Sequence, residues 1–285
     1  TKYGVPSLEK DFPNEETCLN FLFKNLHSEK CSCGGTYRLI SGRRQFQCSK
    51  CRFQIAPMAW TIFEKSSTPL TLWFKAILLF SNAKSGISAK TLQANLEVTY
   101  KCAWRILSEI KKALAQDDKP LEGVIETDVG YFGGRKYAGK NNEKLSEAMK
   151  AKATVIAAVQ RNGKMRAKIV PNASADVLEK FVKGSVEVGS VLLTDKAKGF
   201  NRLDKHYRHF SVHHKKGEYV RYKAHVNTIE TFFSHLKRSI KGTFKSVSKK
   251  HLQSYLDAFV WHYNNRHNDR ARFEALLGAL LQPVK

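Results

Sequence analysis

The chain has 285 residues, 42% hydrophobic and 26% charged, enough for one sizeable core and a small module, which excludes a disordered tail and a lone mini-domain. No apolar stretch reaches the roughly 18 residues of a membrane span and no signal-peptide run opens the sequence, so we expect a soluble cytoplasmic protein without a membrane partner. The net charge of +24, from 49 Lys and Arg against 25 Asp and Glu, favours a polyanionic partner, with an inert basic surface as the alternative.

Residues 1–65 are predicted to form a short helix, over 15–27, followed by a zinc ribbon. Four of the six cysteines fall in two close pairs separated by two short predicted strands at 36–40 and 44–47: Cys31, Cys33, Cys48 and Cys51. Two close pairs of thiolates supply the four tetrahedral ligands of a structural Zn²⁺ without a large core to position them. Reduced structural thiols are the alternative. Cys18 and Cys102 stand alone in apolar contexts, so we expect them to be buried small hydrophobic residues.

Residues 66–118 are predicted to form a helix-turn-helix domain. Pro69 begins a helix that runs to about residue 81, Ser88 is the expected N-cap of a short helix to residue 96, and Thr99 is the expected N-cap of a helix to residue 113. The last helix of such a motif enters a DNA groove, and its predicted DNA contacts are Tyr100, Lys101 and Arg105. A three-helix bundle with solvent-exposed lysines is the alternative. Trp104 is expected on the apolar face.

Residues 119–285 are predicted to form an α/β domain with a mixed sheet flanked by helices. The strand patterns lie at 123–129, 153–160, 164–170, 190–195 and 207–213, and the helical patterns lie at 174–183, 225–240 and 250–263. Asn162 and Gly163 indicate a hairpin turn between the second and third strands. Residues 135–152 are rich in lysine and are expected to form a loop.

Three acids are predicted to meet in this domain. Asp128 and Asp195 each lie near the end of a predicted strand, and Glu230 lies on a helical stripe beside the apolar one, together with Asn227 and Lys237. Carboxylate oxygens are the ligands that Mg²⁺ prefers, and two such ions promote phosphoryl transfer. Taken singly, each acid has a structural alternative: a turn residue, a helix cap, and an ion-pair partner of Lys237.

Four segments of this domain resemble a known family: IETDVGYFGG at 125–134, LLTDK at 192–196, HVNTIETFFSHLKR at 225–238 and HYNNR at 262–266. They are similar to the IS1595-type, ISXO2-like DDE transposases, which are related to Merlin elements. The resemblance extends upstream to the cysteine pairs and to residues 68–74 and 86–93, so it covers most of the chain. Two departures are the single residue between the first two cysteines and Val129 in place of an acid.

The resemblance implies an RNase H-like catalytic domain that cuts terminal inverted repeats of an insertion sequence and joins 3′ hydroxyls to target DNA. It places Asp128 and Asp195 at the first two acidic positions and either Glu230 or Asn227 at the third, where we favour Glu230 as the ligand of two Mg²⁺ or Mn²⁺ ions. Lys237 is expected to neutralise a phosphate. Further predicted DNA contacts are Arg135, Lys136, Lys237 and Arg238.

The remaining expectations concern partners and alternatives. The handling of two DNA ends predicts a homodimer or a larger assembly on double-stranded DNA. The expected location is the nucleoid, or the nucleus if the source is eukaryotic. Two other functions stay open: a non-enzymatic zinc-ribbon and helix-turn-helix regulator, and an RNase H-like nuclease or resolvase.

Overall fold

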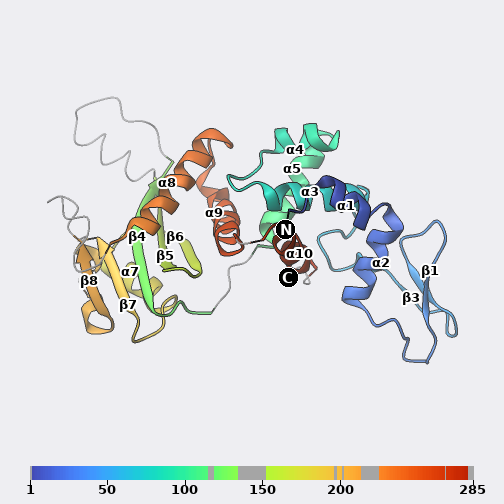
Figure 1. Ribbon diagram of the computed structural model, residues 1–285, viewed down its shortest axis with the longest axis horizontal. Coiled ribbons are helices and arrows are strands. Elements are labelled where there is room, and N and C mark those ends of the chain that lie inside the picture. The colour runs from blue at the N-terminus through green and yellow to red at the C-terminus, as the bar shows by residue number, and fades with distance from the viewer. Residues whose placement is uncertain are drawn as a thin grey trace. The chain divides into compact units, whose positions relative to one another are not determined.

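A computed structural model describes residues 2–114, 119–133, 152–195, 198–200, 202–212, 225–266 and 268–281. The chain divides into two compact units, residues 1–114 with 265–285, and residues 115–264 (Figure 1). No helix in these described ranges is long and apolar enough to cross a membrane.

The first unit begins with helices α1 (Val5–Asp11) and α2 (Glu15–Leu26), followed by a three-stranded antiparallel sheet. Its strands are β1 (Tyr37–Leu39), β2 (Phe46–Cys48) and β3 (Gln54–Ile55). Asn14 caps α2, because its side chain accepts a hydrogen bond from the Thr17 N–H at 2.9 Å. Phe23 of α2 stacks on Phe46 of β2, with ring centroids 4.2 Å apart, and so joins the helix to the sheet.

Three further helices follow in this unit, α3 (Leu70–Asn82), α4 (Ala89–Leu96) and α5 (Tyr100–Lys112). The predicted caps are confirmed, since Ser88 accepts from the Thr91 N–H and Thr99 accepts from the Cys102 N–H. The carboxylate of Glu15 accepts the Leu70 N–H at 2.7 Å and thus joins α2 to α3. Residues 1–65 and 66–114 therefore belong to one compact unit rather than to two separate domains.

A C-terminal helix, α10 (Asp269–Leu280), completes the first unit, which corrects the predicted boundary of the third domain at residue 285. Phe273, Leu276 and Leu280 are buried, and α10 packs against α3. Arg272 is also buried, and it donates a hydrogen bond to the Ser81 carbonyl at 2.9 Å. The apolar face and this hydrogen bond explain why α10 packs in the first unit although residues 115–264 precede it in the chain.

The second unit contains the predicted mixed sheet, in the strand order β6-β5-β4-β7-β8. The strands are β4 (Val124–Phe132), β5 (Ala153–Gln160), β6 (Met165–Val170), β7 (Val191–Asp195) and β8 (Arg208–Val212). β4, β5 and β6 pair antiparallel, whereas β7 pairs parallel with both β4 and β8. Asn162 has a φ of 59° in the turn between β5 and β6, which confirms the predicted hairpin.

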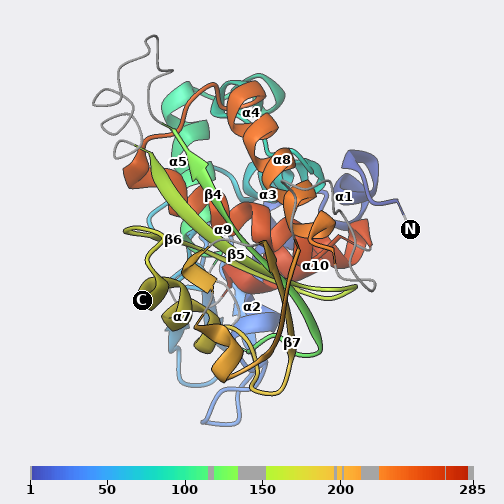
Figure 2. The same cartoon turned by 90° about the vertical axis from the view of Figure 1, so that its left-hand side faces the viewer.

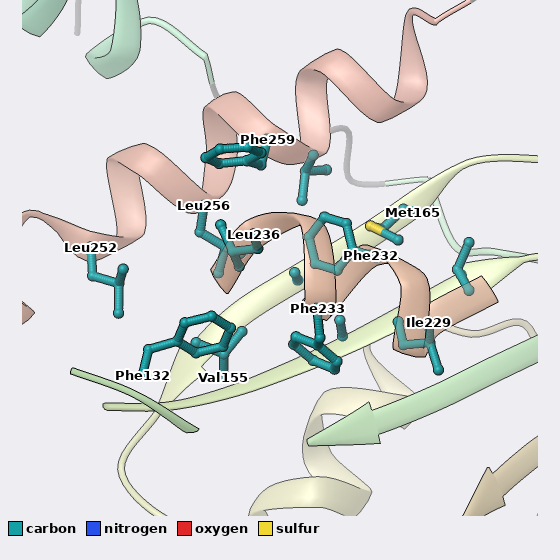
Figure 3. Packing of buried hydrophobic residues seen from close by; sticks show 14 of the residues in the cluster. Phe132, Val155, Met165, Ile229, Phe232, Phe233, Leu236, Leu252, Leu256 and Phe259 are labelled. Carbon is teal, nitrogen blue, oxygen red and sulfur yellow. The ribbon is translucent and has the colours of Figure 1, made fainter. Parts of the chain in front are cut away.

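Helices cover both faces of this sheet (Figure 2). Helices α8 (Asn227–Gly242) and α9 (Lys249–Asn264) pack on one face, and α7 (Ala175–Lys183) packs on the other. Phe233 and Leu236 of α8 meet Val155 of β5 in the core under α8 and α9 (Figure 3). At Gly130 of β4, an added Cβ would lie 2.8 Å from the Phe233 ring, so glycine permits the close approach of α8.

Candidate active site and metal centre

The sheet register places two of the predicted acids side by side. Thr127 of β4 pairs with Thr194 of β7 in a parallel ladder, and Asp128 and Asp195 are the next residues on the two strands. Neighbouring strands lie about 4.8 Å apart, so these two carboxylates leave the sheet close together. Glu126 and Leu193 are one ladder step earlier than the threonines, and Leu193 lies in the core under α8. Asp128 and Asp195 therefore face α8.

The third predicted acid, Glu230, is exposed in the first turn of α8. Its neighbours Ile229 and Phe233 are buried against the sheet, which holds this turn over β4. Glu230 lies close enough for its charge to act on Asp128. The helix thus brings to the two strand aspartates a carboxylate that follows Asp128 by 102 residues in the sequence.

Electrostatics couple these groups at Asp128. The pKa of Asp128 is raised to about 6, chiefly by burial and in smaller part by the charges of Asp195 and Glu230. The Val129 N–H, which donates to the Asp128 carboxylate at 2.7 Å, and the nearby Lys237 act in the opposite direction. A bound cation would offset the repulsion among partly buried carboxylates, so this cluster of like charges is characteristic of a cation site.

The other predicted residues of this site differ in how far the structure describes them. Asn227 is exposed at the first position of α8, one turn before Glu230. The Lys237 ammonium lies 5.8 Å from the centroid of the Phe132 ring, at the far end of β4. Arg238 is exposed on α8. Arg135 and Lys136 lie outside the described residues.

The four predicted zinc ligands lie together in the first unit. The sulfur atoms of Cys31 and Cys51 are 3.6 Å apart, those of Cys33 and Cys48 are 3.4 Å apart, and all four lie within 4.8 Å of one another. Tetrahedral zinc with bonds of about 2.3 Å separates its sulfur ligands by about 3.8 Å, so the four thiols fit such an ion. Among the described residues, no other group of three or more potential ligands is this tight.

Local structure around the cysteines explains how the shortened first pair closes on the second. Gly34 has a φ of 77°, and a Cβ on Gly35 would lie 2.5 Å from the Cys48 sulfur, so the turn requires both glycines. A hydrogen bond from Tyr37 lowers the pKa of Cys31 to about 6, which favours the thiolate that binds metal. Cys18 is fully buried outside the cluster, as predicted, whereas Cys102 is only partly buried.

The residues of α5 that are predicted to contact DNA differ in their exposure and in their contacts. Tyr100 and Lys101 are exposed, as the prediction of DNA contacts requires. Arg105 is partly buried and donates hydrogen bonds to Ser66 and Thr68 within its own unit, at 3.2 and 3.0 Å, so it also has a structural role. Trp104 is 50% exposed, so its expected place in the apolar core is wrong.

Comparisons with known proteins concern both units. A family model described as ISXO2-like transposase domain matches residues 120–264. The chain is 27% identical over 238 residues, 79% of each chain, to an uncharacterized protein in transposable element ISH50 of Halobacterium salinarum. It is 28% identical over 98 residues, 34% of this chain and 78% of the relative, to a transposase-like protein of Haemophilus influenzae. A solved pre-cleavage Mos1 transpososome aligns over 75% of this chain and 80% of that chain, with 10% identity and a TM-score of 0.28.

Proposed function

The chain belongs to the family of ISXO2-like transposases, and from this premise we propose that residues 119–264 form an RNase H-like catalytic domain that cuts and joins DNA with Mg²⁺ or Mn²⁺. The protein is a transposase by its family. The cutting of terminal inverted repeats and the joining of 3′ hydroxyls to target DNA form the finer part of the proposal. The observation that carries it is the adjacent placement of Asp128 and Asp195, with the Glu230 charge acting on Asp128.

The donor set fits a hard divalent cation. Asp128, Asp195 and Glu230 offer only carboxylate oxygens, which are the ligands that Mg²⁺ and Mn²⁺ prefer. When bound, two such ions would activate the attacking oxygen and stabilise the leaving oxygen of the phosphodiester. The chain contributes two carboxylates fixed on rigid strands and one on a packed helix, so that the ligands are held in place before DNA arrives.

Lys237 is proposed to act on the DNA rather than on the cation. Its ammonium lies on α8 two turns beyond Glu230, and its charge already lowers the pKa of Asp128. The Lys237 ammonium would attract a phosphate group of the DNA toward the acids and leave the carboxylates to the metal ions. Arg238 extends the same basic end of α8.

The first unit is proposed to bind the inverted repeats. The net charge of +24 favours a phosphate backbone, and α4 and α5 have the lengths and the tight connection of a helix-turn-helix. The exposed face of α5 would offer Tyr100, Lys101 and Trp104 to the groove. A zinc-bound cysteine cluster would fix the ribbon. Pairing of two ends would require at least a homodimer.

Nicking of a labelled duplex that carries the ends of the element tests the proposal. The wild type is expected to nick with Mg²⁺ or Mn²⁺ and to stop in buffer depleted of both, while Asp128→Asn and Asp195→Asn bind the duplex and do not nick it. Glu122→Gln is the matched control, because Glu122 is an exposed acid just before β4. Nicking by Asp195→Asn at the wild-type rate would contradict the assignment.

Two further arms of this experiment separate the remaining possibilities. Glu230→Gln and Asn227→Ala identify the third ligand, since only the variant that removes it should lose cation-dependent nicking. Duplex binding without nicking in the wild type would favour a non-enzymatic regulator. Nicking without joining of the released end to a target duplex would favour a nuclease or resolvase.

A further inference from the structure

We propose that Glu126 is a positioning residue, whose buried carboxylate fixes the first turn of α8 to β4 and thereby sets the place of Glu230 beside Asp128. Glu126 lies two residues before Asp128 on β4, and the proposed cation site does not include it. The inference rests on the proposed function in one respect only, the assignment of Asp128 and Glu230 to a common cation site.

The contacts of Glu126 are those of a helix cap supplied from another element. The side chain is fully buried. One carboxylate oxygen accepts the backbone N–H groups of Thr228 and Ile229, at 2.8 and 3.2 Å, and the other accepts the Thr228 hydroxyl at 3.0 Å. These residues immediately precede Glu230 in the first turn of α8.

Helix α8 needs this cap because its own N-cap residue has no polar side chain. The first N–H groups of a helix have no partner within the helix, and Ser, Thr, Asp or Asn at the N-cap commonly accepts one of them. In α8 this position is Val226, which makes no side-chain cap and is buried in the core. The carboxylate of Glu126, which precedes Thr228 by 102 residues, takes over the role, and its negative charge also suits the positive end of the helix.

Arg161 balances the buried charge and extends the connection. Its Nε donates to Glu126 at 2.9 Å, and its Nη2 donates to the His225 carbonyl, also at 2.9 Å. Its backbone N–H bonds to the Val124 carbonyl at 3.0 Å. Arg161 thus joins the strand that carries Asp128, the turn after β5 and His225, which lies two residues before α8.

The two proposed ligands, Asp128 and Glu230, lie within two residues of the groups that the Glu126 carboxylate joins. Asp128 follows Glu126 by two residues on the same face of β4, and Glu230 directly follows Ile229. Farther along β4, Gly130 lets Phe233 pack closely, so α8 is held to the strand on both sides of Asp128. Loss of the Glu126 cap would release the end of α8 that carries Glu230 while the Phe233 contact remains.

Two variants separate the cap from the charge. Glu126→Ala removes every acceptor, whereas Glu126→Gln retains one oxygen for the Thr228 and Ile229 N–H groups and loses the ion pair with Arg161 and the bond from the Thr228 hydroxyl. Glu122→Ala is the control, because Glu122 is an exposed acid on the segment just before β4. All three are made in the full chain and compared with the wild type by thermal unfolding, so that each is assayed below its own transition.

The first measurement is amide hydrogen exchange over residues 227–231, which needs neither cation nor DNA. We expect faster exchange in Glu126→Ala, near wild-type exchange in Glu126→Gln and no change in Glu122→Ala. The second is Mn²⁺ affinity by calorimetric titration, corrected with Asp128→Asn for binding elsewhere. Groups that orient metal ligands commonly change affinity by about 10- to 100-fold, and we expect this loss in Glu126→Ala with substantial recovery in Glu126→Gln.

The outcomes distinguish this inference from the proposed function. Wild-type exchange in Glu126→Ala would overturn the cap, and faster exchange with unchanged Mn²⁺ affinity would overturn the positioning role. If Glu126→Ala does not fold, Glu126→Gln decides the question. Wild-type exchange and wild-type Mn²⁺ affinity in Glu126→Gln support the cap. A tenfold loss of Mn²⁺ affinity in this variant with unchanged exchange overturns the role of the cap in positioning Glu230. If the wild type binds no more Mn²⁺ than Asp128→Asn, the cation site fails and the exchange result alone decides the cap.

Discussion

Replacement of Asp128 by Asn is expected to stabilise the protein in the absence of a divalent cation while it abolishes nicking. The pKa of Asp128 is raised from 3.8 to about 6, chiefly by burial and further by the charges of Asp195 and Glu230. One pKa unit corresponds to about 1.4 kcal/mol, so the ionised carboxylate lowers the free energy of unfolding by about 3 kcal/mol at neutral pH. Asn removes the charge and retains an oxygen for the Val129 N–H.

The sign of the pH dependence follows from the direction of this shift. Because the folded-state pKa lies above the unfolded one, the contribution of Asp128 to stability is fully present below pH 3.8 and is lost as the pH rises through about 6. The advantage of Asp128→Asn should therefore be about 3 kcal/mol at pH 8 and about 1 kcal/mol at pH 4.5. For a unit of this size, the larger figure corresponds to a rise of about 6 to 12 °C in melting temperature.

Calorimetric melts in buffer depleted of Mg²⁺ measure this difference at each pH. Strong chelators are avoided, because they would also remove zinc from the cysteine cluster. Added Mg²⁺ is expected to raise the melting temperature of the wild type and to leave Asp128→Asn unchanged. Equal or lower stability of Asp128→Asn at pH 8, or a difference that does not shrink at pH 4.5, would refute the reasoning. Glu122→Gln serves as the control for removal of an exposed acid.

Three further predictions concern other parts of the molecule. Cys48→Ser should lose the bound zinc that metal analysis detects, whereas Cys102→Ser should retain one ion per chain; retention by both would exclude the cysteine cluster as the site. Gly130→Ala should destabilise the protein by about 1 to 3 kcal/mol in denaturant unfolding and slow nicking, because its Cβ would meet the Phe233 ring at 2.8 Å, and wild-type stability would contradict that contact. Trp104→Ala, at a half-exposed position, should change stability by no more than about 0.5 kcal/mol but weaken duplex binding in fluorescence anisotropy, and unchanged affinity would remove this residue from the DNA interface.

Several features of the fold could be predicted because their signals are local. The two cysteine pairs are recognised from their spacing in the sequence. The Ser88 and Thr99 caps depend on N–H groups three residues away. The alternation along β4 and the apolar run of β7 indicate strands without reference to the rest of the chain. Helices α1 and α10 are not predicted, since α1 is short with a single buried residue, Leu8. The place of α10 depends on α3, which lies far away in sequence.

The candidate site could be predicted in its residue types but not in its geometry. Asp128, Asp195 and Glu230 are found from strand ends, helical spacing and a resemblance to a family. Whether the two aspartates are neighbours depends on the register of β4 against β7, which involves residues almost seventy positions apart. Arg105 illustrates the limit, because its place on α5 gives no sign of the hydrogen bonds that it donates to Ser66 and Thr68.

The sequence by itself determined the clustered cysteines, most of the helices and strands, the acidic residues and the family, because short-range spacing and side-chain chemistry encode them. Only the tertiary structure decided which of these residues meet: the pairing of β4 with β7, the transfer of α10 to the first unit, and the capping of α8 by Glu126. The physical reason is that such contacts satisfy buried polar groups and apolar faces across long stretches of chain. Several partners are compatible with each local pattern, and packing selects one.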